Sequence, residues 1–220
     1  MGEIRVEGLT KSYGSTQVLR RMSLAVADKS TLTILGPSGQ GKTTLLRIIA
    51  GLDLPDEGEV YLGGKLVTRP GWATLPHTRG IGFLFQGAAL WPHMTVTQNI
   101  LFGIQDLPKA VAGARVVELL AATELTGLGD RYPDQISGGQ ARRVALARAL
   151  APNPPYLLLD EPMTHVEVAL KDRLLMLVRG HAAATGATMV WVTHEPAEAE
   201  ALGGAVMVLG EDGDAEGSGK

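Results

Sequence analysis

A glycine-rich segment at residues 36–44, with the sequence GPSGQGKTT, constrains the fold of this chain more than any other feature. The apolar run 31–35 before it predicts a short buried strand, and residues 45–50 after it predict a helix that ends at Gly51. A strand, a glycine-rich turn and a helix in this order are typical of a phosphate-binding loop. The loop comprises Gly36, Pro37, Ser38, Gly39, Gln40, Gly41, Lys42, Thr43 and Thr44.

The residue types in this segment suit the binding of phosphate groups. Glycines let consecutive backbone N–H groups turn toward an anion, and the N-terminus of the following helix adds a partial positive charge. Lys42 is expected to reach the outer phosphates, and the Thr43 hydroxyl is expected to ligate Mg²⁺. The alternative is a turn that contains a lysine by chance, but the pattern G-x-x-x-x-G-K-[ST] between a strand and a helix rarely arises that way. The segment therefore predicts a site for a nucleoside triphosphate.

The composition sets the class of protein and excludes several partners. The 220 residues, of which 45% are hydrophobic, suit one large α/β domain or one domain with an inserted subdomain. A net charge of −3 disfavours nucleic acid as the main partner, because phosphate backbones select basic surfaces. The absence of cysteine excludes disulfides and thiolate metal sites, which suits a reducing cytoplasm. There is no apolar signal region at the N-terminus and no apolar run of about eighteen residues, so we expect the chain to be soluble.

A pair of acidic residues follows the second strong strand pattern. Residues 156–159, YLLL, predict a buried strand that delivers Asp160 and Glu161 to its carboxyl end. In a sheet that carries a phosphate loop, the first acid can hold the Mg²⁺ shell and the second can act as a general base on water. Paired acids at a strand end also occur as turn or helix caps, but the phosphate loop upstream favours the catalytic interpretation.

Three further residues have two possible roles when judged from their positions alone. Gln86 ends the apolar strand pattern 81–85, and His194 follows the strand pattern 188–193. Both are either ordinary polar residues at a strand end or part of a ligand crevice, which lies at the carboxyl ends of parallel strands. Tyr13 is a lone aromatic residue in a polar turn, where a surface role is commoner than stacking on a base.

The segment 87–150 differs in character from the rest of the chain. Apolar residues recur at helical spacing over 96–104 and 110–122, which predicts an all-helical insertion. Ser137 can cap a helix over 141–150, while the glycines that follow it leave the helix N-terminus open to anions. The charge run of Arg142, Arg143 and Arg148 on this helix predicts, by itself, a solvated face.

Two other segments are expected to lack regular structure. Residues 67–78 contain two prolines and a glycine and predict a loop. The tail 211–220 is acidic and glycine-rich and is expected to be disordered.

Taken in order, these motifs resemble the ATP-binding-cassette (ABC) family of ATPase subunits over nearly the whole chain. The most diagnostic stretch is residues 136–150, ISGGQARRVALARAL, which looks like the signature motif and its helix. The resemblance implies an α/β fold, with a P-loop NTPase core of mostly parallel sheet and flanking helices, an N-terminal antiparallel β part and an inserted α-helical subdomain. It implies one ABC ATPase domain over 1–220, whose core is 1–86 and 151–210, with the helical subdomain at 87–150 and the tail at 211–220.

The resemblance also assigns nucleotide contacts, with ATP and Mg²⁺ as cofactors. Tyr13 matches the aromatic residue that stacks on adenine, and residues 36–44 match the phosphate loop. Thr43, Gln86 and Asp160 match the residues around Mg²⁺, and Gln86 also matches the glutamine that contacts the attacking water and relays to the transmembrane partner.

For catalysis, the resemblance implies four residues and a second molecule. Glu161 matches the catalytic base and His194 the switch histidine, with Gln86 and Lys42 completing the catalytic set. The signature residues would bind the γ-phosphate of ATP held by a second cassette, so that two chains work as a head-to-tail pair, most simply a homodimer. The signature residues are Ser137, Gly138, Gly139 and Gln140.

The partners and location also come from the resemblance. It implies integral membrane permease subunits, an extracytoplasmic substrate-binding protein, no nucleic acid, and a peripheral position at the cytoplasmic face of the inner (plasma) membrane. Residues 90–100, LWPHMTVTQNI, resemble importer ATPases for small solutes such as metals, anions, polyamines or sugars. The alternatives are an exporter or lipid-handling subunit, a non-transport ABC ATPase, and a mainly regulatory subunit.

One segment departs from the family pattern. Where the family usually has S-A-L-D, this chain has Thr164-His165-Val166-Glu167. We expect this change to affect coupling between two ATP sites more than ATP binding itself.

Overall fold

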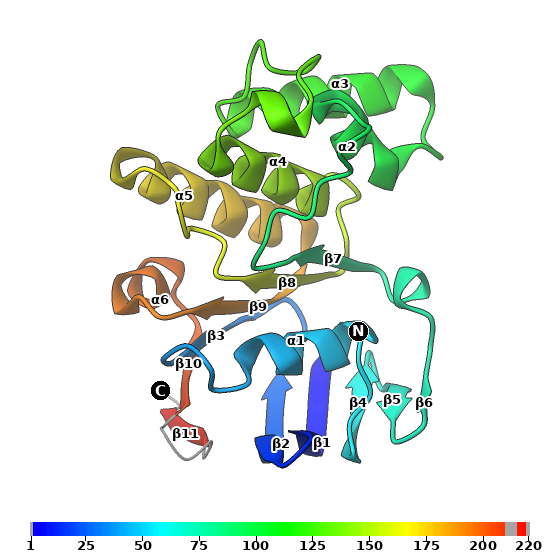
Figure 1. The fold of residues 1–220 in the computed structure, drawn as a ribbon, viewed down its shortest axis with the longest axis vertical. Coiled ribbons are helices and arrows are strands. Elements are labelled where there is room, and N and C mark those ends of the chain that lie inside the picture. Colours follow the sequence, from blue (N-terminus) through cyan, green and yellow to red (C-terminus); the bar gives the residue numbers. More distant parts are fainter. Residues whose placement is uncertain (1, 210–214, 219–220) are drawn as a thin grey trace.

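The strands of the computed structural model, which describes residues 2–209 and 215–218, form two sheets (Figure 1). The five-stranded sheet is antiparallel at each of its pairings and has the order β2-β1-β4-β5-β6. Its strands are β1 (Ile4–Tyr13), β2 (Thr16–Val26), β4 (Glu57–Leu62), β5 (Lys65–Arg69) and β6 (Trp72–Ala73). The predicted loop at 67–78 is therefore wrong in part, because β5 and β6 pair as a short hairpin and η1 (Pro76–Thr78) follows them.

The six-stranded sheet has the order β11-β10-β3-β9-β8-β7, and all of its neighbours except β11 run parallel. Its strands are β3 (Thr31–Leu35), β7 (Ile81–Leu84), β8 (Tyr156–Asp160), β9 (Thr188–Thr193), β10 (Ala205–Leu209) and β11 (Ala215–Ser218). Strand β11 pairs antiparallel with β10, so this part of the tail is a strand where disorder was expected. The rest of that predicted disordered tail, 211–214 and 219–220, lies outside the described residues.

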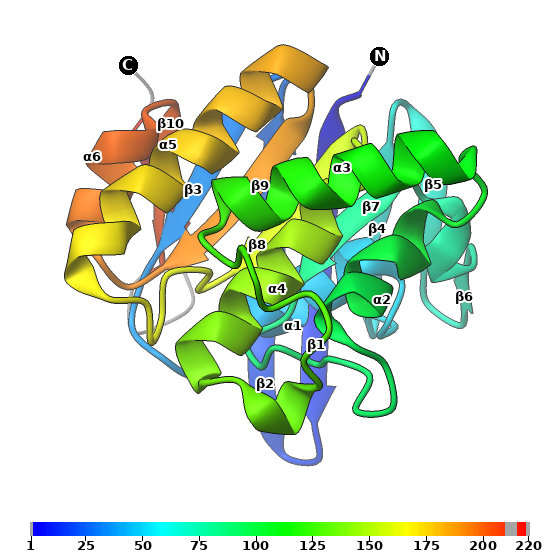
Figure 2. The same ribbon diagram turned by 90° about the horizontal axis from the view of Figure 1, so that it is seen from above.

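Helices cover both faces of the six-stranded sheet. They are α1 (Lys42–Ala50), α2 (Val96–Leu101), α3 (Lys109–Ala122), α4 (Gly138–Leu150), α5 (Val168–Thr185) and α6 (Pro196–Leu202), with the short 3₁₀ helices η2 (Phe102–Ile104) and η3 (Pro133–Gln135). Helices α4 and α5 lie on one face, and α1 lies between the other face and the antiparallel sheet (Figure 1). Figure 2 shows α2 and α3 beside α4, at the end of the sheet formed by β7 and β8.

The central strands are mostly apolar because each of their faces packs into a different core. Strands β8 and β9 are buried along their whole length. In β8, Leu157 and Leu159 join the core formed with the helical layer, whereas Leu158 joins the core around α1 and the antiparallel sheet. A parallel strand covered on both sides reads as a continuous apolar run, as the YLLL pattern does.

A buried arginine joins α1 to the antiparallel sheet. The Arg79 guanidinium is 6% exposed and donates hydrogen bonds to Ile49 O (2.7 Å), Val67 O (2.7 Å) and Thr68 Oγ1 (2.9 Å), as well as to Thr74 O. Burial lowers the pKa of Arg79 to about 10, so the side chain remains a cation at neutral pH. Its charge is balanced by backbone carbonyls, including one at the C-terminal end of α1, where the helix dipole is negative.

We predict that Arg79→Met lowers the free energy of unfolding by about 3 kcal/mol, because buried oxygens lose their donors. Urea denaturation measures this change. Arg20→Met, on an exposed position of β2, is the matched control and should stay within about 0.5 kcal/mol of the parent chain. Equally small losses of unfolding free energy in the two variants would contradict the role of Arg79 in joining α1 to the antiparallel sheet.

Candidate functional site

The phosphate-loop segment connects β3 to α1, and its backbone requires glycine at two positions. Gly39 and Gly41 have φ values of 89° and 80°, in the left-handed region. At Gly41 a Cβ atom would also lie 2.7 Å from Val18 O and 2.8 Å from the Leu19 side chain. Gly41 precedes the first residue of α1, so the N-terminal N–H groups of that helix open into the loop.

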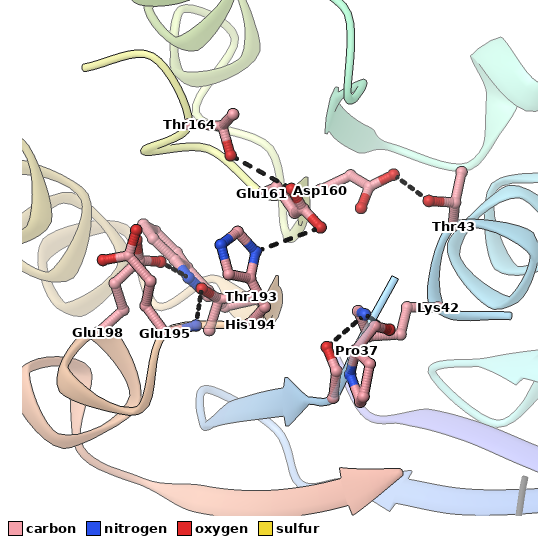
Figure 3. A network of polar contacts seen from close by, with 12 residues as sticks. Pro37, Lys42, Thr43, Asp160, Glu161, Thr164, Thr193, His194, Glu195 and Glu198 are labelled. Atoms are coloured by element: carbon pink, nitrogen blue, oxygen red, sulfur yellow. Dashed lines mark hydrogen bonds and ion pairs between the residues drawn. The ribbon is translucent and has the colours of Figure 1, made fainter. Parts of the chain in front are cut away.

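Lys42 lies across this loop (Figure 3). Its Nζ donates hydrogen bonds to Gly36 O (2.6 Å) and Pro37 O (2.5 Å), and the residue is 4% exposed. Burial lowers the pKa of Lys42, while the nearby carboxylates of Glu161 and Asp160 act in the opposite direction. The loop therefore holds a cationic group beside its glycines.

Thr43 and Asp160 meet although they are far apart in the sequence. The Thr43 hydroxyl donates a hydrogen bond to Asp160 Oδ2 (2.7 Å), while Asp160 Oδ1 is buried without a hydrogen-bond partner. Burial raises the pKa of Asp160, and the hydrogen bond from Thr43 opposes that rise. A hydroxyl and an unpartnered carboxylate oxygen are hard oxygen donors, which fit Mg²⁺. Among the described residues no cluster of three or more His, Cys, Asp or Glu side chains could hold a metal, and Mg²⁺ usually takes its remaining ligands from water and phosphate.

The Glu161 carboxylate is held from two sides (Figure 3). Thr164 Oγ1 donates a hydrogen bond to Glu161 Oε2 (3.2 Å), and His194 Nδ1 lies 3.6 Å from Glu161 Oε1. Glu161 is 8% exposed and has a φ of 47°, an unusual conformation for a residue other than glycine. A constrained backbone and two side-chain contacts thus fix where this carboxylate points.

A cavity of about 310 Å³ brings half of the predicted site residues together, whereas Asp160 and His194 lie outside its lining. The phosphate loop and the first turn of α1 form one wall, and residues from three other parts of the chain complete it. Its lining comprises Tyr13, Val18, Ser38, Gly39, Gly41, Lys42, Thr43, Thr44, Gln86 and Glu161.

The signature residues occupy a different place. Ser137 caps α4 by accepting a hydrogen bond from Gln140 N (3.2 Å), and Gln140 Oε1 accepts one from Ser137 N (2.8 Å). A Cβ atom on Gly139 would lie 2.8 Å from His165 O, so this turn packs against the unusual 164–167 segment. None of residues 137–140 lines the cavity.

Arg142 is a site residue that the charge pattern alone assigned wrongly to a solvated face. It is 3% exposed, and its guanidinium donates to the carbonyls of Gln86 (2.7 Å) and Glu161 (2.5 Å), and also to those of Phe85 and Asp160. Burial lowers the pKa of Arg142, and the two carboxylates oppose this. The signal in the sequence was the apolar run beyond it, VALARAL, which indicates a buried helix in which an arginine needs partners.

Comparison with known proteins identifies the family. Residues 19–164 match the family model described as ABC transporter. The chain is 47% identical over 208 residues to the sulfate/thiosulfate import ATP-binding protein CysA of Thermosynechococcus vestitus, covering 94% of this chain and 61% of that protein. It is 41% identical to the spermidine/putrescine import ATP-binding protein PotA 1 of Pseudomonas aeruginosa, covering 94% and 58%. The chain thus spans about three fifths of the length of these relatives.

Solved structures agree with this match. The ATP-binding cassette MJ0796, solved as a dimer in a post-hydrolysis state bound to ADP and Pi, superposes with a TM-score of 0.88 at 32% identity, covering 97% of this chain and 96% of that one. This agreement confirms the predicted α/β fold with its antiparallel part and helical insertion. None of the helices in the described part of the chain combines the length and apolar character needed to span a bilayer. The matched motif segment, the fold and the relatives together establish that this chain belongs to the ABC transporter family.

Proposed function

We propose that this chain is an ATP-hydrolysing subunit that powers the import of a solute through a separate membrane partner. The observation that carries the proposal is the cavity in which the phosphate loop, Gln86 and Glu161 converge, next to the Thr43–Asp160 contact. The names of the relatives support import over export, because each of those compared is described as an import ATP-binding protein.

In this proposal the triphosphate of ATP lies along the phosphate loop. The N–H groups at the start of α1 and the Lys42 ammonium would contact its oxygens, since both present positive charge inside the cavity. Thr43, Asp160 and Gln86 would hold Mg²⁺, which when bound supplies charge neutralisation for the phosphates. The unpartnered Asp160 Oδ1 supports this assignment.

Hydrolysis would depend on Glu161 as the general base. Its carboxylate lines the cavity and can accept a proton from a water that attacks the γ-phosphorus. His194, at the end of β9 and 50% exposed in its side chain, can reach both this carboxylate and a phosphate beside it. The two contacts that orient Glu161 would keep the base aligned before ATP arrives.

A second copy of the chain would complete the site. Ser137 and Gly138 are exposed at the N-terminus of α4 and lie outside the chain's own cavity, so the Ser137 hydroxyl hydrogen and the Gly138 N–H are available to an anion on another molecule. The dimeric form of the solved cassette supports the pairing of two copies. The head-to-tail arrangement follows from the proposed contact between the signature residues and ATP on the other copy.

An apolar groove supports a contact with permease subunits. It lies between the α/β core and the helical layer, and it has a volume of about 430 Å³. Phe85, Trp91 and Phe102 line it, and the last two rings lie 4.2 Å apart. A helix of the membrane partner would dock here, beside Gln86. A peripheral position at the cytoplasmic membrane face and an extracytoplasmic substrate-binding protein follow from the importer proposal.

We predict that Glu161→Gln lowers ATP turnover by about 10²- to 10⁴-fold, because the amide cannot accept a proton from water. ATP affinity should be retained, and the chain should elute as a dimer with ATP. Turnover assays and size-exclusion chromatography measure this, with exposed Glu200→Gln as the matched control. Undiminished turnover in Glu161→Gln would remove Glu161 from the mechanism.

A second prediction concerns Arg142. Arg142→Lys should lower turnover by at least about tenfold, because a lysine cannot hold the backbone beside Gln86 and Glu161 in one geometry. The control is Arg143→Lys, since Arg143 bonds the carbonyls of Thr123 and Glu124 away from the cavity. Steady-state assays should show the loss in Arg142→Lys alone; equal turnover in both variants would contradict the role given to Arg142.

A further inference from the structure

Tyr13 lines the cavity from the end of β1, but its side chain is only partly supported by the core. It is 47% exposed, whereas Lys42 and Glu161, which also line the cavity, are buried. A half-exposed aromatic side chain can adopt several rotamers, and fixing one of them opposes binding of a ligand. Any contact that holds the ring in the free chain would reduce that cost.

The contact that does so comes from the loop between α1 and β4. The Tyr13 hydroxyl donates a hydrogen bond to Asp53 Oδ2, and Asp53 Oδ1 accepts one from Leu54 N (2.9 Å). The two oxygens of the Asp53 carboxylate therefore accept different hydrogen bonds, one from the Tyr13 phenol and one from the loop backbone. This arrangement leaves the ring little freedom to rotate away.

Lys11 also contacts both Tyr13 and the loop that carries Asp53. Its Nζ lies 5.1 Å from the centroid of the Tyr13 ring and 3.4 Å from Asp53 Oδ1, and it donates a hydrogen bond to Leu54 O (2.7 Å). A cation at this distance from an aromatic face is attracted to it. The same ammonium thus contacts the ring, the carboxylate and the loop.

The electrostatics agree with this geometry. Burial acts to raise the pKa of Asp53, but the hydrogen bonds from Tyr13 and Leu54 N and the charge of Lys11 outweigh it and lower that pKa. Asp53 is therefore ionised at neutral pH and can accept a charge-assisted hydrogen bond from the phenol. The pKa of Tyr13 is raised, through burial first and then through this hydrogen bond, so the phenol keeps its proton.

We propose that Asp53 is a positioning residue that holds the Tyr13 ring in place for the base of a nucleotide. The proposal rests on the proposed function, in which ATP occupies the cavity beside Tyr13. The phosphates contact the loop directly, so Asp53 acts only on the part of the affinity that comes from the base.

The test compares a ligand that has a base with one that lacks it. Asp53→Ala should weaken ATP binding by roughly 3- to 10-fold, the cost of ordering one side chain, and leave inorganic tripolyphosphate binding unchanged. Tyr13→Phe, which lacks the hydroxyl, should reproduce this loss, and the double variant should lose no more than either single variant. Asp53→Asn keeps an acceptor oxygen and should lie close to the parent chain. Isothermal titration calorimetry on the full chain provides both affinities.

Glu57→Ala, which removes an exposed carboxylate four residues away, is the matched control and should bind both ligands normally. An unchanged ATP affinity in Asp53→Ala, or an equal loss for ATP and tripolyphosphate, would overturn the Asp53 proposal alone. A parent chain that binds neither ligand, with Lys42→Ala indistinguishable from it, would overturn the proposed function and the Asp53 proposal together. If Asp53→Ala fails to fold, Tyr13→Phe serves as the test: a loss of ATP affinity alone supports the proposal, and an unchanged ATP affinity overturns it.

Discussion

The geometry of the site depends on one buried cation and the backbone carbonyls that it joins. Arg142 extends from the first turns of α4 to the carbonyls of Phe85, Gln86, Asp160 and Glu161, at the ends of the adjacent strands β7 and β8. A guanidinium presents its donors in a rigid plane, so it sets the relative position of the groups it bonds. The helix that carries the signature residues is thereby fixed to the edge of the sheet from which Gln86 and Glu161 emerge. Without the guanidinium, the carbonyls that it bonds would lose these charge-assisted hydrogen bonds.

The order of strands explains why residues from distant parts of the chain meet. Parallel strands end at the same edge, so the phosphate loop after β3, the acids after β8 and His194 after β9 all lie along it. Strand β9 lies between β3 and β8 in the sheet. The Thr43–Asp160 hydrogen bond nevertheless joins the start of α1, which follows β3, to the end of β8. Sequence patterns predicted each strand and the polar residue at its end. They contain no information on the order of the strands, which comes from the structure.

Pattern analysis misjudged Arg142 and made no prediction for Arg79 or for the Thr164–Glu161 contact, for a common physical reason. Arg79 and Arg142 are buried cations whose partners are backbone carbonyls, and a sequence does not show which carbonyls a helix end or a strand end leaves unpaired. The Thr164–Glu161 contact was hidden for a similar reason, since it depends on the left-handed backbone at Glu161. By contrast, the phosphate loop was predictable, because its glycines, lysine and threonine are consecutive and their roles are local.

Under the proposed function, the same backbone segment faces two ligands. Phe85 lines the apolar groove and Gln86, the next residue, lines the cavity, while Arg142 bonds the carbonyls of both. A helix that presses on the groove and an ATP molecule that fills the cavity would therefore act on adjacent peptide units. Because the same guanidinium also bonds the Glu161 carbonyl, a shift of this segment cannot occur without changing the bonds that position the catalytic base. Coupling between the membrane partner and hydrolysis thus needs no long pathway, because Arg142 bonds both the segment at the groove and the backbone of the catalytic base.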